Sequence, residues 1–484
     1  MNRPTVSLFI IIAAFLTISA CMRLGPDYQR PDPSVKVPDT FQNAPEAVLE
    51  LTHPEDSWWQ VFGDAEIDLL VNEVLKNNLD IKKAAARILE IQSQFVQTRA
   101  ERFPELGLEA RRKRQNQTVT SSLTGTNYRL TTDSYALALP ATFEWDLWGR
   151  LARAEEAARA DLLYAQENRH TVAQTVVAET ISLYLQMESM ERRIQLLQKT
   201  IENFEKNTEL VEARYTHGLT PVLDVRQARR LLAQAESGLP PLYQTLGVVQ
   251  QKMSVLLGRY PRTRPPRNQP EDYFNNLAPV PPGLPSDLLL RRPDIRAAES
   301  QLKALNALVG VAKASRFPRI TLTGSFGYSS EQLNDLFNPK SELWNLALGA
   351  VQPLFNAGKL KAGQKAAQAR YAQGLTDYAK AVLGAFSEVE EALLTRRQQL
   401  QRRRRVLNFL DEARATRQVA QNRYRRGLVD YLSFLDAQRV EFTAEESLIL
   451  VDFSILNNRV ALHRSLGGGW ANLGKPEMLG ADRQ

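Results

Sequence analysis

The sequence contains one long unit twice. The matching positions agree in residue type and spacing: Asp80-Ile81 and Phe103-Pro104 in the first copy correspond to Asp294-Ile295 and Phe317-Pro318 in the second. The offset is constant, since 294 minus 80 and 317 minus 103 both give 214. A repeat of this length is one large unit duplicated in tandem, not a solenoid of small units. The molecule is therefore expected to consist of two pseudo-equivalent halves, at residues 65–275 and 276–470.

A second pair of matching segments marks two turns. Gly218-Leu219 recurs as Gly427-Leu428, with an offset of 427 minus 218, or 209, so the second copy has lost about five residues in between. Residues 150–217 and 385–426 lead into these turns, and residues 428–466 follow the second, all without Gly or Pro. A helix as long as the first stretch reaches on the order of 100 Å. A glycine between two helical stretches favours a left-handed cap, so both turns are predicted to be tips of helical hairpins.

Four shorter segments change to a two-residue period. Apolar residues alternate with small or polar ones at about 104–116, 133–145, 318–330 and 343–353. This pattern is typical of transmembrane barrel strands and also of sandwich strands with one wet face. If the strands form a barrel, one chain cannot close it, because the smallest membrane barrels have about eight strands and open edges are not tolerated in lipid. Three chains would supply twelve strands and enough long helices to close a tube.

The N-terminus has the pattern of a secretory signal. A short charged start, an apolar run over residues 6–18 and small residues precede Cys21, the only cysteine. The run is too short for a permanent membrane helix, so we expect residues 1–20 to be a signal peptide and Cys21 to be acylated, for example with palmitate. An ordinary signal peptide with an incidental cysteine is the alternative. The lipid anchor favours the barrel over the sandwich, and Met22, where an aspartate would favour the inner membrane, favours the outer membrane.

The composition of the rest of the chain limits the classes of partner that we expect. Residues 21–64 are rich in proline and are expected to form a lipid-anchored extended arm, and residues 471–484 a C-terminal tail. The isoelectric point is about 9.3, but acidic residues are nearly as numerous as basic ones and lie between them. This mixture is typical of solvated helix faces, so we expect no nucleic-acid partner. After Cys21 no apolar stretch approaches the roughly 20 residues of a membrane helix.

A set of short motifs extends over nearly the whole mature chain. In chain order they are Gly25-Pro26-Asp27-Tyr28, Trp58-Trp59, Arg102-Phe103-Pro104, Trp148-Gly149-Arg150, Arg291-Arg292-Pro293-Asp294 and Leu435-Asp436-Ala437-Gln438. With these motifs the chain resembles the TolC-type outer-membrane factors, the outer-membrane channels of efflux systems, and most of all their lipoprotein branch. The resemblance implies an α+β membrane protein and a homotrimer: a twelve-stranded β-barrel in the outer membrane, with four strands per chain, continued by a long α-helical coiled-coil tunnel in the periplasm.

The resemblance also implies a function and partners. It predicts a passive exit duct for drugs or other small toxic compounds, and so a role in multidrug resistance. An inner-membrane RND-type transporter would deliver the compounds through a periplasmic adaptor. The tips at Gly218-Leu219 and Gly427-Leu428 are expected to contact that adaptor.

The second tip carries a candidate gate. Asp436 and Arg439 match charged residues at the periplasmic constriction of the family, and Leu432 matches an apolar ring. Asp224, near the first tip, and Tyr424 complete the candidate set. Three copies of an acidic side chain around a narrow pore select for cations or hold the pore shut by pairing. The alternative is that these are ordinary charges on a helix surface.

One position departs from the family pattern. Some members carry a second aspartate three residues before the one matched by Asp436, and here that position is Ser433. A double acidic ring is therefore in doubt.

No catalytic motif stands out. Glu167 and His170 have the spacing of a helical di-iron ligand pair, but such a site needs a second copy, so a surface histidine is the favoured interpretation. No nucleophile elbow, phosphate-binding loop or set of cysteine ligands occurs. We expect no enzyme, no cofactor and no metal.

Two basic runs remain. We interpret residues 402–405 as a solvated helix surface. Residues 111–114 lie near the far end of the first strand, where about half should face the channel mouth and half lipid headgroups. The sequence is equally consistent with two environments for this run, the phosphate groups of lipopolysaccharide and plain solvent.

Two other functions compete with drug efflux. The first is an outer-membrane duct of a type I protein secretion system. The second is a lipid-anchored periplasmic coiled-coil adaptor or scaffold, which would keep the helices and the lipid but would not need the alternating strands.

Overall fold

The computed structural model describes residues 23–31, 38, 40–44, 57–120, 122, 125–267, 280 and 285–468. The predicted signal peptide, Cys21 and the predicted tail at 471–484 lie outside the described residues. The chain divides into two compact units: the first comprises residues 1–32, 88–165 and 297–378, and the second residues 33–87, 166–296 and 379–484. Among the described helices, none combines the length and the apolar character needed to cross a bilayer.

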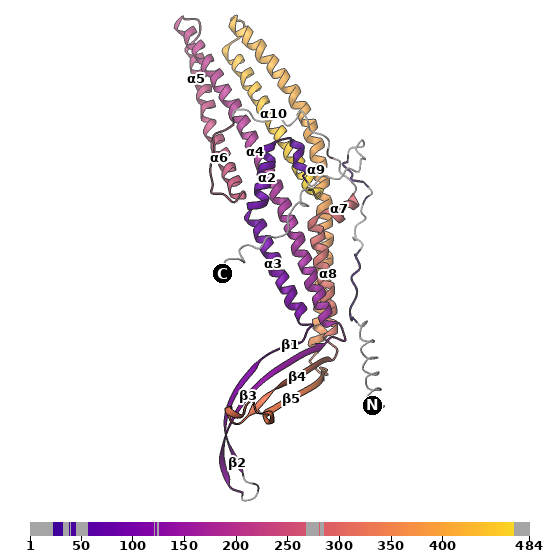
Figure 1. Ribbon diagram of the computed structural model, residues 1–484. Coiled ribbons are helices and arrows are strands. Elements are labelled where there is room, and N and C mark those ends of the chain that lie inside the picture. Colours follow the sequence, from indigo (N-terminus) through magenta and orange to yellow (C-terminus); the bar gives the residue numbers. More distant parts are fainter. Residues whose placement is uncertain are drawn as a thin grey trace. The chain divides into compact units, whose positions relative to one another are not determined.

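Long helices and one antiparallel sheet make up the described chain (Figure 1). The α-helices are α2 (Ala65–Asn77), α3 (Leu79–Ala100), α4 (Arg150–Thr216), α5 (Val222–Ser237), α6 (Leu239–Leu256), α7 (Pro285–Arg291), α8 (Pro293–Ala314), α9 (Lys359–Arg425) and α10 (Tyr431–Ser465). The strands are β1 (Glu105–Leu106), β2 (Glu109–Thr120), β3 (Asn127–Trp145), β4 (Arg319–Ser330) and β5 (Glu342–Val351). Short 3-10 turns are η1 (Trp58–Phe62), η2 (Leu333–Asp335) and η3 (Pro339–Ser341).

The tandem repeat is visible in the helix lengths. Helices α3 and α8 both contain 22 residues, and α4 and α9 both contain 67. The first pair is offset by 293 minus 79, or 214, and the second by 359 minus 150, or 209. The residues missing from the second copy therefore lie between these helices, in the strands, where β3 has 19 residues and β5 only 10.

The two copies differ in the helical stretch that follows the hairpin tip. In the second copy α10 is a single helix of 35 residues, whose base is held where the Arg292 guanidinium donates to the Ser465 carbonyl at 2.9 Å. The corresponding stretch of the first copy is divided into α5 and α6 at Gly238. Pro240 and Pro241 follow after Leu239, and proline cannot continue a helix hydrogen-bond ladder from a preceding turn.

Helix α9 begins much earlier than the sequence indicated. The uninterrupted pattern started at residue 385, but the helix starts at Lys359 and passes through Gly363, Gly374 and Gly384. Each glycine costs a helix about 1 kcal/mol relative to alanine. Gly374 has a packing reason, because a Cβ there would lie 2.6 Å from Leu305 Cδ1 on α8.

All four predicted strand segments lie in the sheet, although β2 continues to Thr120 and β3 begins at Asn127, outside the predicted bounds. Its order is β1-β3-β4-β5, and β2 pairs with β3 beside β1. The segment predicted at 104–116 contains β1 and the first part of β2. Both strands pair with β3 in the same register, with a short break in the pairing between them. Gly107 donates to the Pro140 carbonyl at 3.0 Å, but Pro140 has no N–H to return the bond. Within the described chain β2 and β5 each pair with another strand on one side only. A periplasmic adaptor or scaffold would not need such strands, so that alternative does not explain the sheet.

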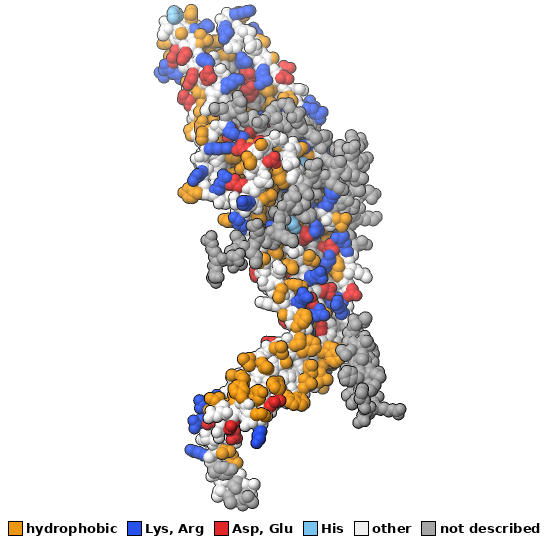
Figure 2. Space-filling model, in the orientation of Figure 1, with side chains coloured by type: hydrophobic (Ala, Val, Ile, Leu, Met, Phe, Trp, Pro, Cys, Tyr) orange, Lys and Arg blue, Asp and Glu red, His pale blue; other side chains and the backbone are white. Residues whose placement is uncertain are grey.

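The two faces of the sheet differ as predicted. Directly opposite residues share a face, which puts these apolar side chains together: Leu137, Leu139, Phe143, Leu322, Phe326, Trp344, Leu346 and Leu348. The other face carries small or polar side chains: Ala138, Thr142, Thr321, Thr323, Ser325, Asn345 and Ala347. Leu346 and Leu348 are each 68% exposed in the single chain. We call the first set the apolar face; hydrophobic side chains dominate this part of the surface in Figure 2.

The N-terminal segment docks on the helices of the first unit. Leu24 donates to the Trp148 carbonyl at 3.1 Å, and Asn306 donates to the Pro26 carbonyl at 2.9 Å. The side chain of Arg153, only 2% exposed, forms an ion pair with Asp27 at 2.7 Å. Gly25 has a φ of 114° and lies so close to Gly310 that a Cβ would approach its Cα to 2.6 Å. The predicted arm is thus an ordered, extended segment where the structure describes it.

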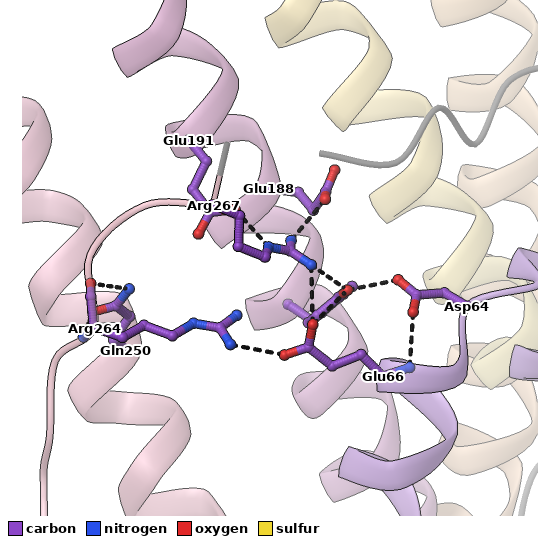
Figure 3. A network of polar contacts seen from close by, with 8 residues as sticks. Asp64, Glu66, Glu188, Glu191, Gln250, Arg264 and Arg267 are labelled. Carbon is purple, nitrogen blue, oxygen red and sulfur yellow. Dashed lines mark hydrogen bonds and ion pairs between the residues drawn. The ribbon is translucent and has the colours of Figure 1, made fainter. Parts of the chain in front are cut away.

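A segment after α6 is tied to the second unit by arginines. We call residues 258–267 the return strap. The Arg267 guanidinium donates to Glu191 at 2.9 Å, Glu188 at 2.7 Å and Glu66 at 3.0 Å, as Figure 3 shows. Arg264 donates to Glu66 at 2.9 Å. Burial alone would lower the pKa of Arg267, but its hydrogen bonds to Glu191 and Tyr184 raise it above the ordinary value.

Candidate functional site

The two predicted tips have the same backbone geometry. Gly218 and Gly427 both have a φ of 72°. Leu219 donates to the Arg214 carbonyl and Leu428 to the Arg423 carbonyl, each at 2.9 Å. These are left-handed glycine caps that satisfy carbonyls at the ends of α4 and α9. The repeat therefore builds the same turn twice.

A buried cluster joins the two hairpins just behind the tips. It contains Val211, Val225, Ala228, Tyr424, Tyr431, Phe434 and Leu435, which come from α4, α5, α9 and α10. The rings of Tyr424 and Phe434 are stacked with centroids 5.6 Å apart, and the Arg214 guanidinium lies 5.1 Å from the Tyr424 centroid. We call this set the tip cluster.

Tyr424 belongs to this cluster and is only 6% exposed. Its hydroxyl has no hydrogen-bond partner among the described residues. Burial raises the pKa of both Tyr424 and Tyr431, so both phenols are neutral. Tyr424 thus supports the tip from inside, unlike the exposed members of the candidate gate.

Three of the predicted gate residues form a line on the outer face of α10. Leu432, Asp436 and Arg439 are spaced by four and three residues, so they lie above one another on one helix face. Leu432 is 55% exposed. The Arg439 guanidinium donates to Asp436 Oδ1 at 2.7 Å, and the two side chains are 67% and 60% exposed. We call these three side chains the gate line.

Asp224 is held in place on its own helix. It accepts a hydrogen bond from the Thr220 hydroxyl across the first turn of α5. Within one chain Arg439 therefore pairs with Asp436 and not with Asp224. The second tip differs, because Asp430 is the N-cap of α10 and accepts from the Ser433 backbone N–H at 2.9 Å, whereas Pro221, the N-cap of α5, provides no side-chain cap. Asp430 was not among the predicted residues, although a carboxylate before a helix start is a recognisable cap signal.

The tips expose apolar side chains. Leu219 is 67% exposed and Leu428 is 61% exposed. Val222 and Leu223, at the start of α5, are 52% and 59% exposed. The residues predicted to contact an adaptor are therefore accessible in the chain.

The other candidates have structural partners. Glu167 forms an ion pair with Arg296 at 2.5 Å, and burial raises the pKa of Glu167. Within the described residues no group of three or more His, Cys, Asp and Glu side chains is arranged to hold a metal ion. Arg403 pairs with Asp452 at 2.7 Å, and Arg402, Arg404 and Arg405 are exposed, as a solvated helix surface requires.

Comparison with known proteins decides the family. The family model described as outer membrane efflux protein matches residues 70–258 and 284–468, one segment in each copy. The chain belongs to the outer membrane efflux protein family.

Individual relatives agree with this assignment. The chain is 32% identical over 463 residues to the probable outer membrane lipoprotein SilC of Salmonella typhimurium, which covers 95% of this chain and 98% of the relative. It is 33% identical over 412 residues to the solvent efflux pump outer membrane protein SrpC of Pseudomonas putida, covering 85% and 87%. Among solved structures, the outer-membrane channel OprN aligns with a TM-score of 0.86 and 29% identity, covering 93% of this chain and all of OprN. The structure of CusC aligns with a TM-score of 0.82 and 30% identity over 92% of this chain.

These findings confirm the main predictions. The protein is an outer-membrane efflux channel with barrel strands and a periplasmic helical part, built from a tandem repeat. Its relatives include a protein of a cation efflux system. The family is one of channels and not of enzymes.

Proposed function

We propose that this efflux channel is a passive duct without chemistry of its own, closed at its periplasmic end by the gate line. The observation that carries the proposal is the exposed row of Leu432, Asp436 and Arg439 on α10, directly in front of the buried tip cluster. An exposed apolar side chain beside an exposed ion pair gives one constriction that is both hydrophobic and charged. Around a threefold axis each of these side chains appears three times.

The class of substrate is inferred from the relatives and not from a binding pocket. Relatives are named for a cation efflux system and for solvent efflux pumps. A duct of one construction that serves such different compounds leaves selection to the transporter. We therefore propose that this chain exports small toxic compounds, and that its exposed tips, Gly218-Leu219 and Gly427-Leu428, receive the adaptor.

The gate needs only a modest closing energy. An exposed ion pair contributes about 0.2–1 kcal/mol, and threefold symmetry repeats it. In the assembled channel Arg439 has two possible acceptors, Asp436 of its own chain and a carboxylate such as Asp224 on a neighbouring helix. A total of a few kcal/mol biases a two-state gate strongly, and an adaptor that binds the open state better by a similar amount reverses it.

Removal of the charged pair tests the gate. The double variant D436A/R439A should raise single-channel conductance in planar bilayers, because the pore loses the pairs that hold it shut. The matched control is E202A/K206A, which removes another exposed pair one helical turn apart, at 2.6 Å on α4. The trimer should remain intact in both variants.

Two outcomes decide the proposal. A raised conductance in D436A/R439A, with the control at the wild-type level, supports a gate at this position. A wild-type conductance already equal to that of D436A/R439A would show that these residues do not hold the pore shut.

A further inference from the structure

Basic residues gather at the end of the sheet that lies away from the helices. The helices of the first unit join the sheet where β3 ends at Trp145 and α4 begins at Arg150. Away from that junction β2 carries four consecutive basic residues at 111–114, and β3 carries Arg129. Figure 2 shows Lys and Arg side chains around this end of the sheet, beyond the hydrophobic surface.

The strand register divides this basic run between the two faces. Arg112 lies opposite Tyr135, and Arg114 lies opposite Asp133. Tyr135 and Asp133 alternate in step with Leu137, so Arg112 and Arg114 extend the apolar face. Arg129 follows the same alternation on β3. Arg111 and Lys113 point to the opposite, polar face.

The height of the apolar face matches a membrane. Trp145 and Tyr135 are separated by 145 minus 135, or ten, residues of β3. This distance is about 33 Å along a strand at about 3.3 Å per residue, and about 25 Å across the membrane at a strand tilt of about 40°, which is the usual height of the lipid-facing band. Aromatic side chains mark both ends of such a band, so Tyr135 reaches the outer interface and Arg112 lies at headgroup level.

The charges at this level are only partly compensated. The Arg112 guanidinium carbon lies 5.5 Å from the Tyr135 ring centroid. Asp133 lies between the two arginines, 4.0 Å from Arg112 and 3.8 Å from Arg114. Both arginine side chains stay exposed, at 64% and 68%. Two guanidinium groups thus share one carboxylate, and Arg129 lies opposite Thr118 farther out on the same face. This arrangement leaves a positive surface at the outer edge of the apolar face.

We propose that Arg112, Arg114 and Arg129 bind the phosphate groups of lipopolysaccharide in the outer leaflet. The proposal rests on the proposed outer-membrane channel. A guanidinium presents parallel N–H donors that match phosphate oxygens in pairs, and an aromatic ring beneath it keeps the group at the interface. Lipid A places its phosphates directly above its acyl chains, so one molecule meets the apolar face and the arginines together.

A second copy of this chain offers the competing partner. In a closed barrel the free edge of β2 pairs with the free edge of a neighbour's β5, whose first residue is Glu342. Glu342 lies opposite Tyr328 and so shares the apolar face. An arginine–glutamate contact between copies would use the same charges for assembly and not for lipid.

The experiment compares two sets of neighbouring residues in the detergent-purified trimer. The test variant is R112Q/R114Q/R129Q, and the matched control is R111Q/K113Q, which removes charge from the same strand on the opposite face. Native mass spectrometry measures binding of bisphosphorylated lipid A and of its dephosphorylated form. We expect the test variant to bind bisphosphorylated lipid A about tenfold more weakly, the control to equal the wild type, and the dephosphorylated form to bind all three proteins weakly and equally.

The outcomes separate this proposal from the channel itself. Wild-type affinity in the test variant, or an equal loss in R111Q/K113Q, overturns the lipid site. Loss of the trimer in the test variant and equally in E342Q overturns it in favour of a contact between copies. Conductance in planar bilayers is measured in parallel. Channel activity in all variants supports the proposed duct, whatever the result for lipid binding. Lack of channel activity in the wild type contradicts the proposed duct.

Discussion

His463 is a buried titratable side chain near the end of α10. Its ring stacks on Trp58 with centroids 4.7 Å apart and planes inclined by 10°. Neither ring nitrogen has a hydrogen-bond partner among the described residues. Burial lowers the pKa of His463 to about 3, and the nearby Arg459 and Arg396 lower it further in the same direction. The folded protein therefore holds this ring neutral.

A pH dependence of stability follows from this pKa. Above pH 6.5 the ring is neutral in both the folded and the unfolded chain. As the pH falls from 6.5 to about 3, His463 binds a proton in the unfolded chain but not in the folded chain. The free energy of unfolding therefore falls by up to about 1.4 kcal/mol for each pH unit. The variant H463F keeps a ring on Trp58 and removes the titration. Thermal unfolding at pH 7.5 and pH 5 should show a smaller loss for H463F than for the wild type, and equal losses would contradict the argument.

Gly327 allows two strands to approach. A Cβ at this position would lie 2.2 Å from the Leu137 carbonyl oxygen and 2.7 Å from Ala138 Cα, both backbone atoms of β3. Backbone in a sheet cannot move aside without breaking the ladder. G327A should therefore reduce the amount of assembled channel in the outer membrane several-fold. G324A is the control on the same strand, because its nearest atoms lie 3.4 Å away; similar losses in both variants would refute a specific close approach.

At the scale of elements, the return strap depends on one arginine. Glu191 is fully buried and the Glu188 side chain is 4% exposed, and both accept from Arg267. Removal of one partner from a buried ion pair costs about 3–5 kcal/mol, because the remaining charge stays desolvated. R267A should lower the melting temperature and make the chain near the strap sensitive to protease. R264A, which removes a 44%-exposed arginine of the same strap, should change little; equal effects would show that Arg267 has no special role.

The same strap illustrates what the sequence predicts and what it does not. Hairpin tips, strand periods and the repeat depend on local patterns, and all of them were predicted close to their residues. The strap has no period, and prolines such as Pro261 and Pro265 give it the composition of a linker. Its structure depends on Arg267 meeting carboxylates from α2 and α4, which lie 76 to 201 residues away in the chain. Contacts at such separations leave no trace in one sequence.

The candidate site was also predictable only in part. The spacing of Leu432, Asp436 and Arg439 predicts their common helix face, and the structure has them on it. The burial of Tyr424 was not predictable, because it depends on Arg214 of α4 and Phe434 of α10 packing against its ring. The early start of α9 was not predicted because three glycines interrupt the helical pattern before residue 385, and a packing contact with α8 accounts for only one of them, Gly374.

At the scale of the whole molecule, the two unpaired edges require assembly. Edge strands β2 and β5 present unpaired backbone groups, which lipid cannot satisfy. The native mass in mild detergent should therefore be that of three chains. The intact mass should show a diacylated or triacylated Cys21. C21S should lose the acyl mass and keep the trimer, since the edges and not the lipid hold the chains together. A stable wild-type monomer would rule out a shared barrel.

The unbroken α10 has a mechanical consequence. Its 35 residues form a rod of about 52 Å, fixed at the base where Arg292 binds the Ser465 carbonyl and carrying the gate line near the other end. A rod fixed at one end is a lever, and a tilt of about 5° at its base moves its tip by about 4–5 Å. The equivalent stretch of the first copy is divided at Gly238 into α5 and α6, so it is not one continuous rod. The duplication thus supplies each chain with one continuous arm and one divided arm, and the continuous arm converts a small rotation near its base into a displacement as wide as an ion.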